Sequence, residues 1–177
     1  MPPASAPLSQ PLPGASLAQA ISRYVRSATT FVGRASKSEY WWVMLVLLLV
    51  GAVPGAMLTV GLVRGIAHRF ESSEPVQIGA EGSREQIGIA GPGILEEPTA
   101  AVLIPLGLVL LALLWLVTLV PTLALSWRRL HDGGLAGPWF FLSLLPGVGG
   151  LFLIVLMLQP SKPEGRRFDA AAPPDAA

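Results

Sequence analysis

Residues 99–125 read TAAVLIPLGLVLLALLWLVTLVPTLAL, 27 consecutive residues without a charged side chain. A helix that crosses a membrane needs about 20 such residues, because it rises 1.5 Å per residue through about 30 Å of hydrocarbon. Residues 41–63 and 138–158, with 23 and 21 uncharged residues, pass the same test. A core helix of a soluble protein would carry a polar face, and none of these stretches has one. The sequence predicts an all-α, polytopic membrane protein with three apolar segments.

The composition of the chain agrees with this class. Of its 177 residues, 52% are apolar and only 13% are charged, about half the charged fraction of a soluble domain. A net charge of +1 gives no basic field for nucleic acid, and the absence of cysteine excludes disulfides and thiolate metal sites. The two histidines are far apart in sequence. We therefore expect the lipid bilayer as the main partner, no nucleic acid, and no metal or cofactor.

The remaining segments divide the chain into a membrane domain and two tails. Residues 1–16, rich in Pro, Ala and Ser, predict a disordered tail, and residues 170–177 predict another. The membrane domain covers residues 17–169. Within it, residues 64–98 form a polar loop with six acidic and three basic residues.

The stretch before the first span, residues 17–30, combines apolar residues at helical spacing with two arginines and no acid. This pattern favours an N-terminal interfacial helix that lies against anionic headgroups. A solvated lead-in to the first span is the alternative.

The third apolar stretch allows two arrangements. Its centre, LLPGVGG at residues 144–150, holds a proline and three glycines, which a straight helix disfavours. It is either a kinked span or a re-entrant hairpin, whose broken backbone must be buried against protein. The 21-residue length favours the span. Basic residues near the membrane and the acidic loop place the N-terminus and the RRLHD sequence in the cytoplasm.

The sequence FVGRASKSEYWW, residues 31–42, predicts a capped helix that enters the membrane. Gly33 permits a turn, Ser36 or Ser38 can cap the helix, and Glu39 follows Ser36 at the spacing of a capping box. Three aromatic residues then predict a belt at the headgroup level: Tyr40, Trp41 and Trp42. Arg34 has no role in this structural account.

The sequence SWRRLHDGGLAGPW, residues 126–139, predicts the end of the second helix as it leaves the bilayer. Its charged residues form two i,i+3 pairs, Arg128 with His131 and Arg129 with Asp132. Gly133 and Gly134 then stop the helix, and Pro138 and Trp139 restart the chain at the interface. A positive-inside anchor explains the arginines but leaves His131 and Asp132 unexplained.

These two polar clusters are predicted to face the same side of the membrane. We interpret them as one interfacial network, since charges near a membrane are best satisfied in pairs. An anion-binding site for a lipid headgroup or small anion is the alternative, and catalysis with His131 as a general base oriented by Asp132 is the third. The candidate residues for the network or the anion site are Arg34, Ser36, Lys37, Glu39, Arg128, Arg129, His131 and Asp132.

The sequences GRASKSEYWW, RRLHDGGLAGPW, LLPGVGG and GRRFD together resemble the bacterial inner-membrane proteins grouped as domain of unknown function 805. The resemblance covers roughly residues 17–169 and implies a multi-pass protein of the bacterial inner membrane. The chain departs from the family pattern in its long acidic loop, and at residues 166–169, where the family usually has Asn and Gly. The remaining positions that match the family are Gly33, Tyr40, Trp41, Leu130, Gly134, Trp139, Pro146 and Gly149.

The resemblance implies a location and a fold without an activity. We therefore predict a non-enzymatic protein whose polar network has a structural or interaction role. Its contact would be another membrane protein or a second copy of the chain. Transport is a weaker alternative, because no charged residue lies within the apolar segments.

Overall fold

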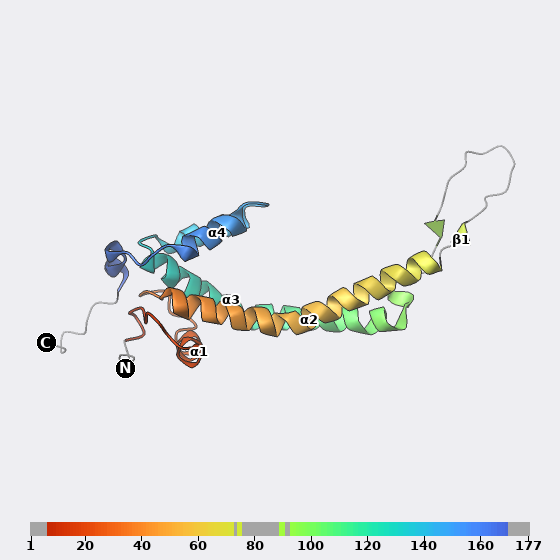
Figure 1. Ribbon diagram of the computed structural model, residues 1–177, viewed down its shortest axis with the longest axis horizontal. Helices are drawn as coiled ribbons and strands as arrows, with labels where there is room; N and C mark the ends of the chain where they lie inside the picture. Colours follow the sequence, from red (N-terminus) through yellow and green to blue (C-terminus); the bar gives the residue numbers. More distant parts are fainter. Residues whose placement is uncertain (1–6, 73, 76–88, 91–92, 170–177) are drawn as a thin grey trace. The chain divides into compact units, whose positions relative to one another are not determined.

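The computed structural model describes residues 7–72, 74–75, 89–90 and 93–169 of the chain (Figure 1). Two helices of 35 residues dominate it, α2 (Lys37–Glu71) and α3 (Pro98–Asp132). The shorter elements are, in chain order, α1 (Leu17–Arg26), β1 (Glu74–Pro75), β2 (Ile89–Ala90), η1 (Ile94–Glu96), η2 (Gly137–Leu144), α4 (Gly149–Leu158) and η3 (Pro163–Phe168). The predicted helical class is confirmed, apart from the two-residue antiparallel pair of β1 and β2.

The helices α2 and α3 contain the first two predicted apolar segments and extend past both ends of each. Only 11% of an apolar 18-residue window of each helix is buried, whereas the core helix of a soluble domain is mostly buried. The exposed side chains are large and apolar, as at Leu48 and Val117, which are 69% and 73% exposed. α2 continues to Glu71, into the predicted polar loop. Residues 73, 76–88 and 91–92 of that loop, and residues 1–6 and 170–177 of the predicted tails, lie outside the described residues.

The chain forms two compact units, Met1–Leu48 with Leu116–Ala177, and Leu49–Trp115. In the second unit, the later part of α2 packs closely against the first part of α3. A Cβ atom on Gly107 would lie 2.9 Å from the carbonyl oxygen of Pro54, so the two backbones nearly touch. Close approach through small residues is a common way for apolar helices to associate.

The first unit has the buried core and the polar residues. The Ser16 side chain caps α1, and a capping box with Gln19 completes its first turn. α1 packs on α3, where the hydroxyl of Tyr24 lies 2.9 Å from that of Thr122. The core combines residues from α1 to α4: Ala20, Tyr24, Ala35, Tyr40, Val43, Leu125, Leu130 and Met157.

Residues 7–16 differ from the prediction of a disordered tail. Leu12 and Ala15 are 6% and 3% exposed, and their amides donate to the side chains of Glu39 and Ser38. The segment has few large apolar side chains. The burial of Leu12 and Ala15 and the hydrogen bonds of the backbone nevertheless hold it in place. The segment therefore belongs to the first unit.

The third apolar stretch, residues 138–158, does not form one continuous helix. The 3-10 helix η2 ends at Leu144, the chain turns through Pro146 and Gly147, and α4 runs back beside η2 (Figure 1). At its start, Gly137 lies directly on the ring of Trp127. At its end, the carbonyl of Met157 accepts a hydrogen bond of 3.0 Å from Arg129. Both ends thus lie beside the same turn of α3, and the segment is a hairpin.

Candidate functional site

Residues 33–35 are the point where three distant parts of the first unit join. Their three consecutive amides donate to carbonyls of three different segments: Gly33 to Phe168 at 2.8 Å, Arg34 to Ser9 at 2.9 Å and Ala35 to Arg128 at 3.0 Å. One short stretch of backbone therefore holds the N-terminal arm (residues 7–16), the end of α3 and the C-terminal segment (residues 159–169). Every buried amide there is satisfied, as a stable junction requires.

Gly33 is required at this junction by its conformation and its surroundings. Its φ is +91°, a region that L side chains rarely adopt. A Cβ atom there would also lie 2.5 Å from the carbonyl oxygen of Ser9. The turn predicted from the sequence is thus confirmed, and its cause is the close approach of the N-terminal arm.

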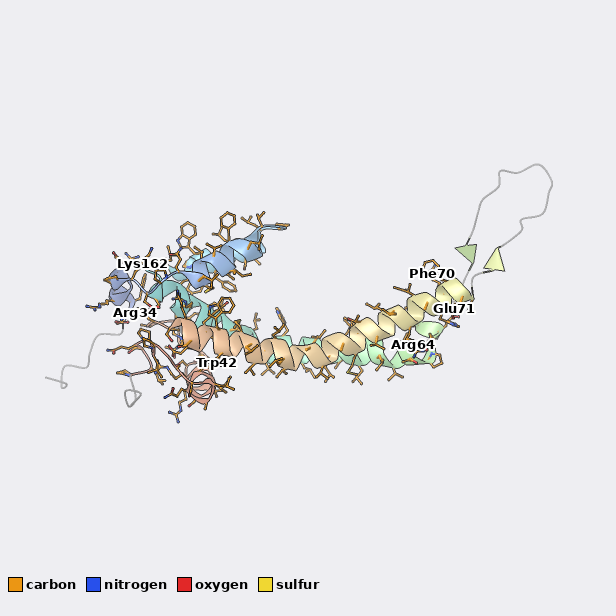
Figure 2. The ribbon with its side chains drawn as sticks, viewed as in Figure 1. Arg34, Trp42, Arg64, Phe70, Glu71 and Lys162 are labelled. Carbon is orange, nitrogen blue, oxygen red and sulfur yellow. The ribbon has the colours of Figure 1, made fainter. Side chains whose placement is uncertain are left out.

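Asp132 is the centre of the first group of charges. Its side chain is fully buried, Oδ2 accepts hydrogen bonds from Arg129 NH1 at 2.8 Å and from the hydroxyl of Ser161, and Oδ1 lies 3.7 Å from Arg34 NH1. Its backbone carbonyl accepts a further bond of 2.8 Å from the amide of Lys162. Figure 2 shows the side chains of Arg34 and Lys162 at this end of the first unit. Asp132 therefore joins the end of α3 to residues before α2 and after α4.

Arg34 lies between two carboxylates. Its Nε and NH2 each donate to Asp169 at 2.7 Å, a bidentate pair in addition to its contact with Asp132. The hydrogen bonds to Asp169 raise the pKa of the Arg34 guanidinium, and partial burial opposes them. Arg34 thus stays charged and fixes the C-terminal segment to the residues before α2.

His131 contacts the C-terminal segment instead of the arginine one turn before it. Its Nδ1 lies 3.1 Å from the carbonyl oxygen of Gly33, and because a carbonyl only accepts, Nδ1 carries the proton. The ring stacks on Phe168, with centroids 3.9 Å apart and planes at 5°, and Arg167 lies over Phe168 at 4.7 Å. The predicted pairing of His131 with Arg128 is not what the structure shows. Asp132 accepts hydrogen bonds from Arg129, Ser161 and the amide of Lys162. It therefore does not orient His131 as a general base.

Gly165 allows the C-terminal segment to lie this close. A Cβ atom at this position would be 2.4 Å from the carbonyl oxygen of His131 and 3.1 Å from Cδ of Arg34. Any side chain there would push η3 away from the end of α3. The close packing explains how Phe168 and Asp169 reach His131 and Arg34.

Glu39 is the centre of the second group. Its side chain is 2% exposed; Oε1 pairs with Nε of Arg23, and Oε2 accepts from the amides of Leu12 at 2.9 Å and Ser36 at 2.7 Å. The amide of Glu39 donates in turn to Ser36 Oγ at 3.3 Å, which confirms the predicted capping box. The same carboxylate therefore caps α2 and holds the N-terminal arm and α1.

Arg128 is the least satisfied charge in the site. Its side chain is fully buried, and its Nε makes one long hydrogen bond of 3.4 Å to the carbonyl of Ala124. NH1 and NH2 have no hydrogen-bond partner among the residues that the structure describes. The charges of Glu39 and Arg23 both act on it. Arg128 is thus buried beside a carboxylate that already accepts three hydrogen bonds from other groups.

We expect Arg128→Met to change the free energy of unfolding by less than about 1 kcal/mol, because an apolar side chain of similar volume removes a buried charge with few hydrogen bonds. The neighbouring Arg129→Met is the matched control and should destabilise the protein by about 3–5 kcal/mol, since it strips Asp132 of its buried partner. Thermal unfolding in detergent measures both variants. Equal destabilisation would contradict this account and would mean that the guanidinium of Arg128 holds a group of its own.

The structure assembles the predicted residues into two linked groups. Arg34, Arg129 and Asp132 meet directly in the first, and Ser36 and Glu39 meet in the second. Lys37 is exposed and His131 is held by stacking. Four further residues were missed by the sequence analysis: Arg23, Ser161, Phe168 and Asp169. Only the family-like GRRFD sequence pointed to the last two.

The remaining motif residues lie around these two groups, in α2, at the end of α3 and in the hairpin. Tyr40 is buried and its hydroxyl hydrogen-bonds to Ser126, while Trp41, edge-on to it at 5.4 Å, and Trp139 are exposed. Gly134 ends α3 with a φ of +79°. Pro146 lies in the turn of the hairpin, and Gly149 packs on the carbonyl of Leu142. In the part of the chain that the structure describes, no three His, Asp or Glu side chains converge as a metal site would require.

Comparison with known proteins agrees with the motifs. Residues 28–170 match the family described as protein of unknown function (DUF805). The chain is similar to the inner membrane protein YhaI of Escherichia coli strain K12 and of Escherichia coli O157:H7. In each case 27% of residues are identical over 138 residues, which cover 78% of this chain and 81% of the relative. No solved structure matches it. Because the match covers most of the chain and includes Arg34, Glu39, Asp132 and the hairpin, the chain belongs to the DUF805 family.

Proposed function

We propose that the chain is a multi-pass inner-membrane protein in which α2 and α3 cross the bilayer. Each helix has 35 residues and would be about 52 Å long, more than the roughly 30 Å of hydrocarbon. Their exposed apolar side chains would be stable in lipid and unstable in water. The inner-membrane description of the Escherichia coli relative supports this location.

In this arrangement the hairpin of η2 and α4 is re-entrant instead of being a third span. α4 has ten residues, which gives about 15 Å, and η2 has eight, which gives about 16 Å, so each reaches about halfway through the hydrocarbon. Both ends of the hairpin lie beside residues 127–129 of α3. The broken backbone around Pro146 would then enter the membrane and return to the same side.

The first unit would face the cytoplasm. All lysines and arginines of the chain except Arg64, Arg69 and Arg84 belong to this unit, and the positive-inside rule places such a concentration on the cytoplasmic side. The ion pair of Arg34 with Asp169 supports an arrangement in which both ends of the described chain lie on the same side of the membrane. The C-terminal tail would thus be cytoplasmic together with the N-terminus.

The role that the geometry supports best is structural and non-enzymatic. The observation that carries it is the fully buried Asp132, which holds groups from before α2, from α3 and from the segment after α4. Such a network fixes the relative positions of these segments, and its outer surface would be presented to a partner protein or a second copy. Most of the charged side chains pair with one another, as in a scaffold.

Cysteine labelling tests this topology, because the natural chain has no cysteine to remove. We expect Ser72→Cys to react with a membrane-impermeant maleimide in intact spheroplasts. Thr30→Cys and Arg166→Cys should react only after the membrane is opened. All three positions are exposed, so differences in labelling report the side of the membrane.

Labelling of Arg166→Cys from outside would contradict the proposal at its main point. The C-terminal segment could not then contact Arg34, and the third apolar stretch would have to cross the bilayer. Labelling of Thr30→Cys and Arg166→Cys from outside, with Ser72→Cys protected, would keep the hairpin and reverse the orientation.

A further inference from the structure

A groove lies between the N-terminal arm and α1, beside the pair of Arg23 with Glu39. Its volume is about 550 Å³. The arm contributes apolar side chains from Pro7, Leu8 and Leu12, and α1 contributes mainly polar ones. The lining residues on α1 are Ala18, Gln19, Ser22, Arg23 and Arg26.

Three hydrogen-bond donors face this groove from one side of α1. Gln19, Ser22 and Arg26 follow one another at i, i+3 and i+7, so they share a face of the helix. The Oε1 atom of Gln19 accepts from the amide of Ser16, which leaves its NH2 group as a donor. Arg26 is exposed, in contrast to Arg23, which is buried against Glu39. The face therefore offers an exposed guanidinium, a hydroxyl and an amide.

The charge of the groove is positive. None of the described residues that line it is acidic. Glu39 lies behind it, paired with Arg23, and Arg128 is buried next to this pair. Arg23, Arg26 and Arg128 thus bring three positive charges to this part of the first unit, and Glu39 brings one negative charge. A group that brings negative charge to the mouth of the groove would be attracted.

A second face of α1 is apolar and exposed. Leu17, Ile21 and Val25 follow one another at i, i+4 and i+8, and Leu17 and Val25 are 43% and 65% exposed. An exposed apolar ridge beside a basic face is typical of a helix in the membrane interface. This second face would place α1, and the groove beside it, at the surface of the membrane.

We propose that this groove binds one anionic phospholipid, with its phosphate at Arg26, Ser22 and Gln19. Its glycerol and upper acyl carbons would lie on Leu8 and Leu12. This inference rests on the proposed membrane location, but it assigns the anion to α1 instead of the arginines predicted from the sequence. Arg34 and Arg129 already pair with Asp169 and Asp132.

Native mass spectrometry of the full-length protein in detergent, titrated with phosphatidylglycerol or phosphatidylcholine, tests the site. We expect phosphatidylglycerol to bind more tightly, and Arg26→Gln to weaken it about fivefold, the factor that corresponds to ~1 kcal/mol for one basic residue. Ser22→Glu should weaken it further, because the new carboxylate faces the phosphate. Arg166→Gln removes an exposed arginine outside the groove and is the matched control.

Equal losses for Arg26→Gln and Arg166→Gln would overturn the proposal, since the attraction would then be a general effect of basic charge. Displacement of the lipid by millimolar inorganic phosphate would also overturn it, in favour of a free anion. If the topology is as proposed and Arg26→Gln and Ser22→Glu both bind phosphatidylglycerol normally, the lipid site alone is wrong and the membrane arrangement stands.

Discussion

Asp132→Asn is expected to lower the free energy of unfolding by about 3–5 kcal/mol, the usual effect of removing one partner from a buried ion pair. Asparagine keeps the size of the side chain but leaves Arg129, fully buried, without its counter-charge. Arg34 also loses its second carboxylate. Thermal unfolding in detergent measures the loss, and the amount of protein in the membrane fraction should fall with it.

Asp169→Asn is the control for this experiment. Its side chain is 21% exposed and forms an ion pair with Arg34, so we expect a loss of about 1 kcal/mol. A normal melting temperature and normal abundance of Asp132→Asn would contradict the scaffold role. The network would then be free to serve a ligand.

Glu39→Gln should have a comparable effect, again about 3–5 kcal/mol, because the carboxylate is nearly fully buried against Arg23. The side-chain amide of glutamine has one accepting oxygen, so the N-terminal region loses either the pair with Arg23 or the hydrogen bonds from the amides of Leu12 and Ser36. We expect the arm and α1 to separate from α2. Limited trypsin digestion should then cleave after Arg23, which is buried in the natural protein.

Glu164→Gln serves as the matched control, since Glu164 is exposed in η3. It should leave both the melting temperature and the digestion pattern unchanged. If Glu39→Gln showed the same digestion pattern as this control, Glu39 would be a helix cap only. Its pairing with Arg23 would then contribute little to the attachment of the arm.

The sequence predicted the elements that depend on local pattern. Long uncharged stretches predicted α2 and α3, because the length of an apolar run is read directly from the chain. The stop at Asp132 followed from the two glycines after it, and the structure has α3 end there. Ser36 and Glu39 are three residues apart, and so are Arg129 and Asp132. Helical geometry alone therefore brings together the two residues of the capping box and the two residues of the ion pair.

What the sequence could not predict depends on distant partners. Pro146 and its neighbouring glycines break a helix equally well in a kinked span and in a hairpin, and only the contacts of Gly137 and Met157 with α3 decide. The GRRFD sequence indicates a C-terminal motif, but nothing in it indicates that Asp169 pairs with Arg34, 135 residues away. The composition of the arm is that of a disordered tail, although its backbone is held by Glu39 and Arg34.

The separation of Arg34 from Asp169 also has a consequence for biogenesis. The ribosome adds about 5–20 residues per second, so Asp169 is made roughly 7–27 s after Arg34. Throughout this interval the amide of Gly33 and one side of Arg34 lack their final partners, even when α2 and α3 are complete. The junction around residues 33–35 therefore closes last, after the hairpin has been synthesised. Every nascent or truncated chain that ends before residue 168 therefore leaves the amide of Gly33 without its partner at this junction.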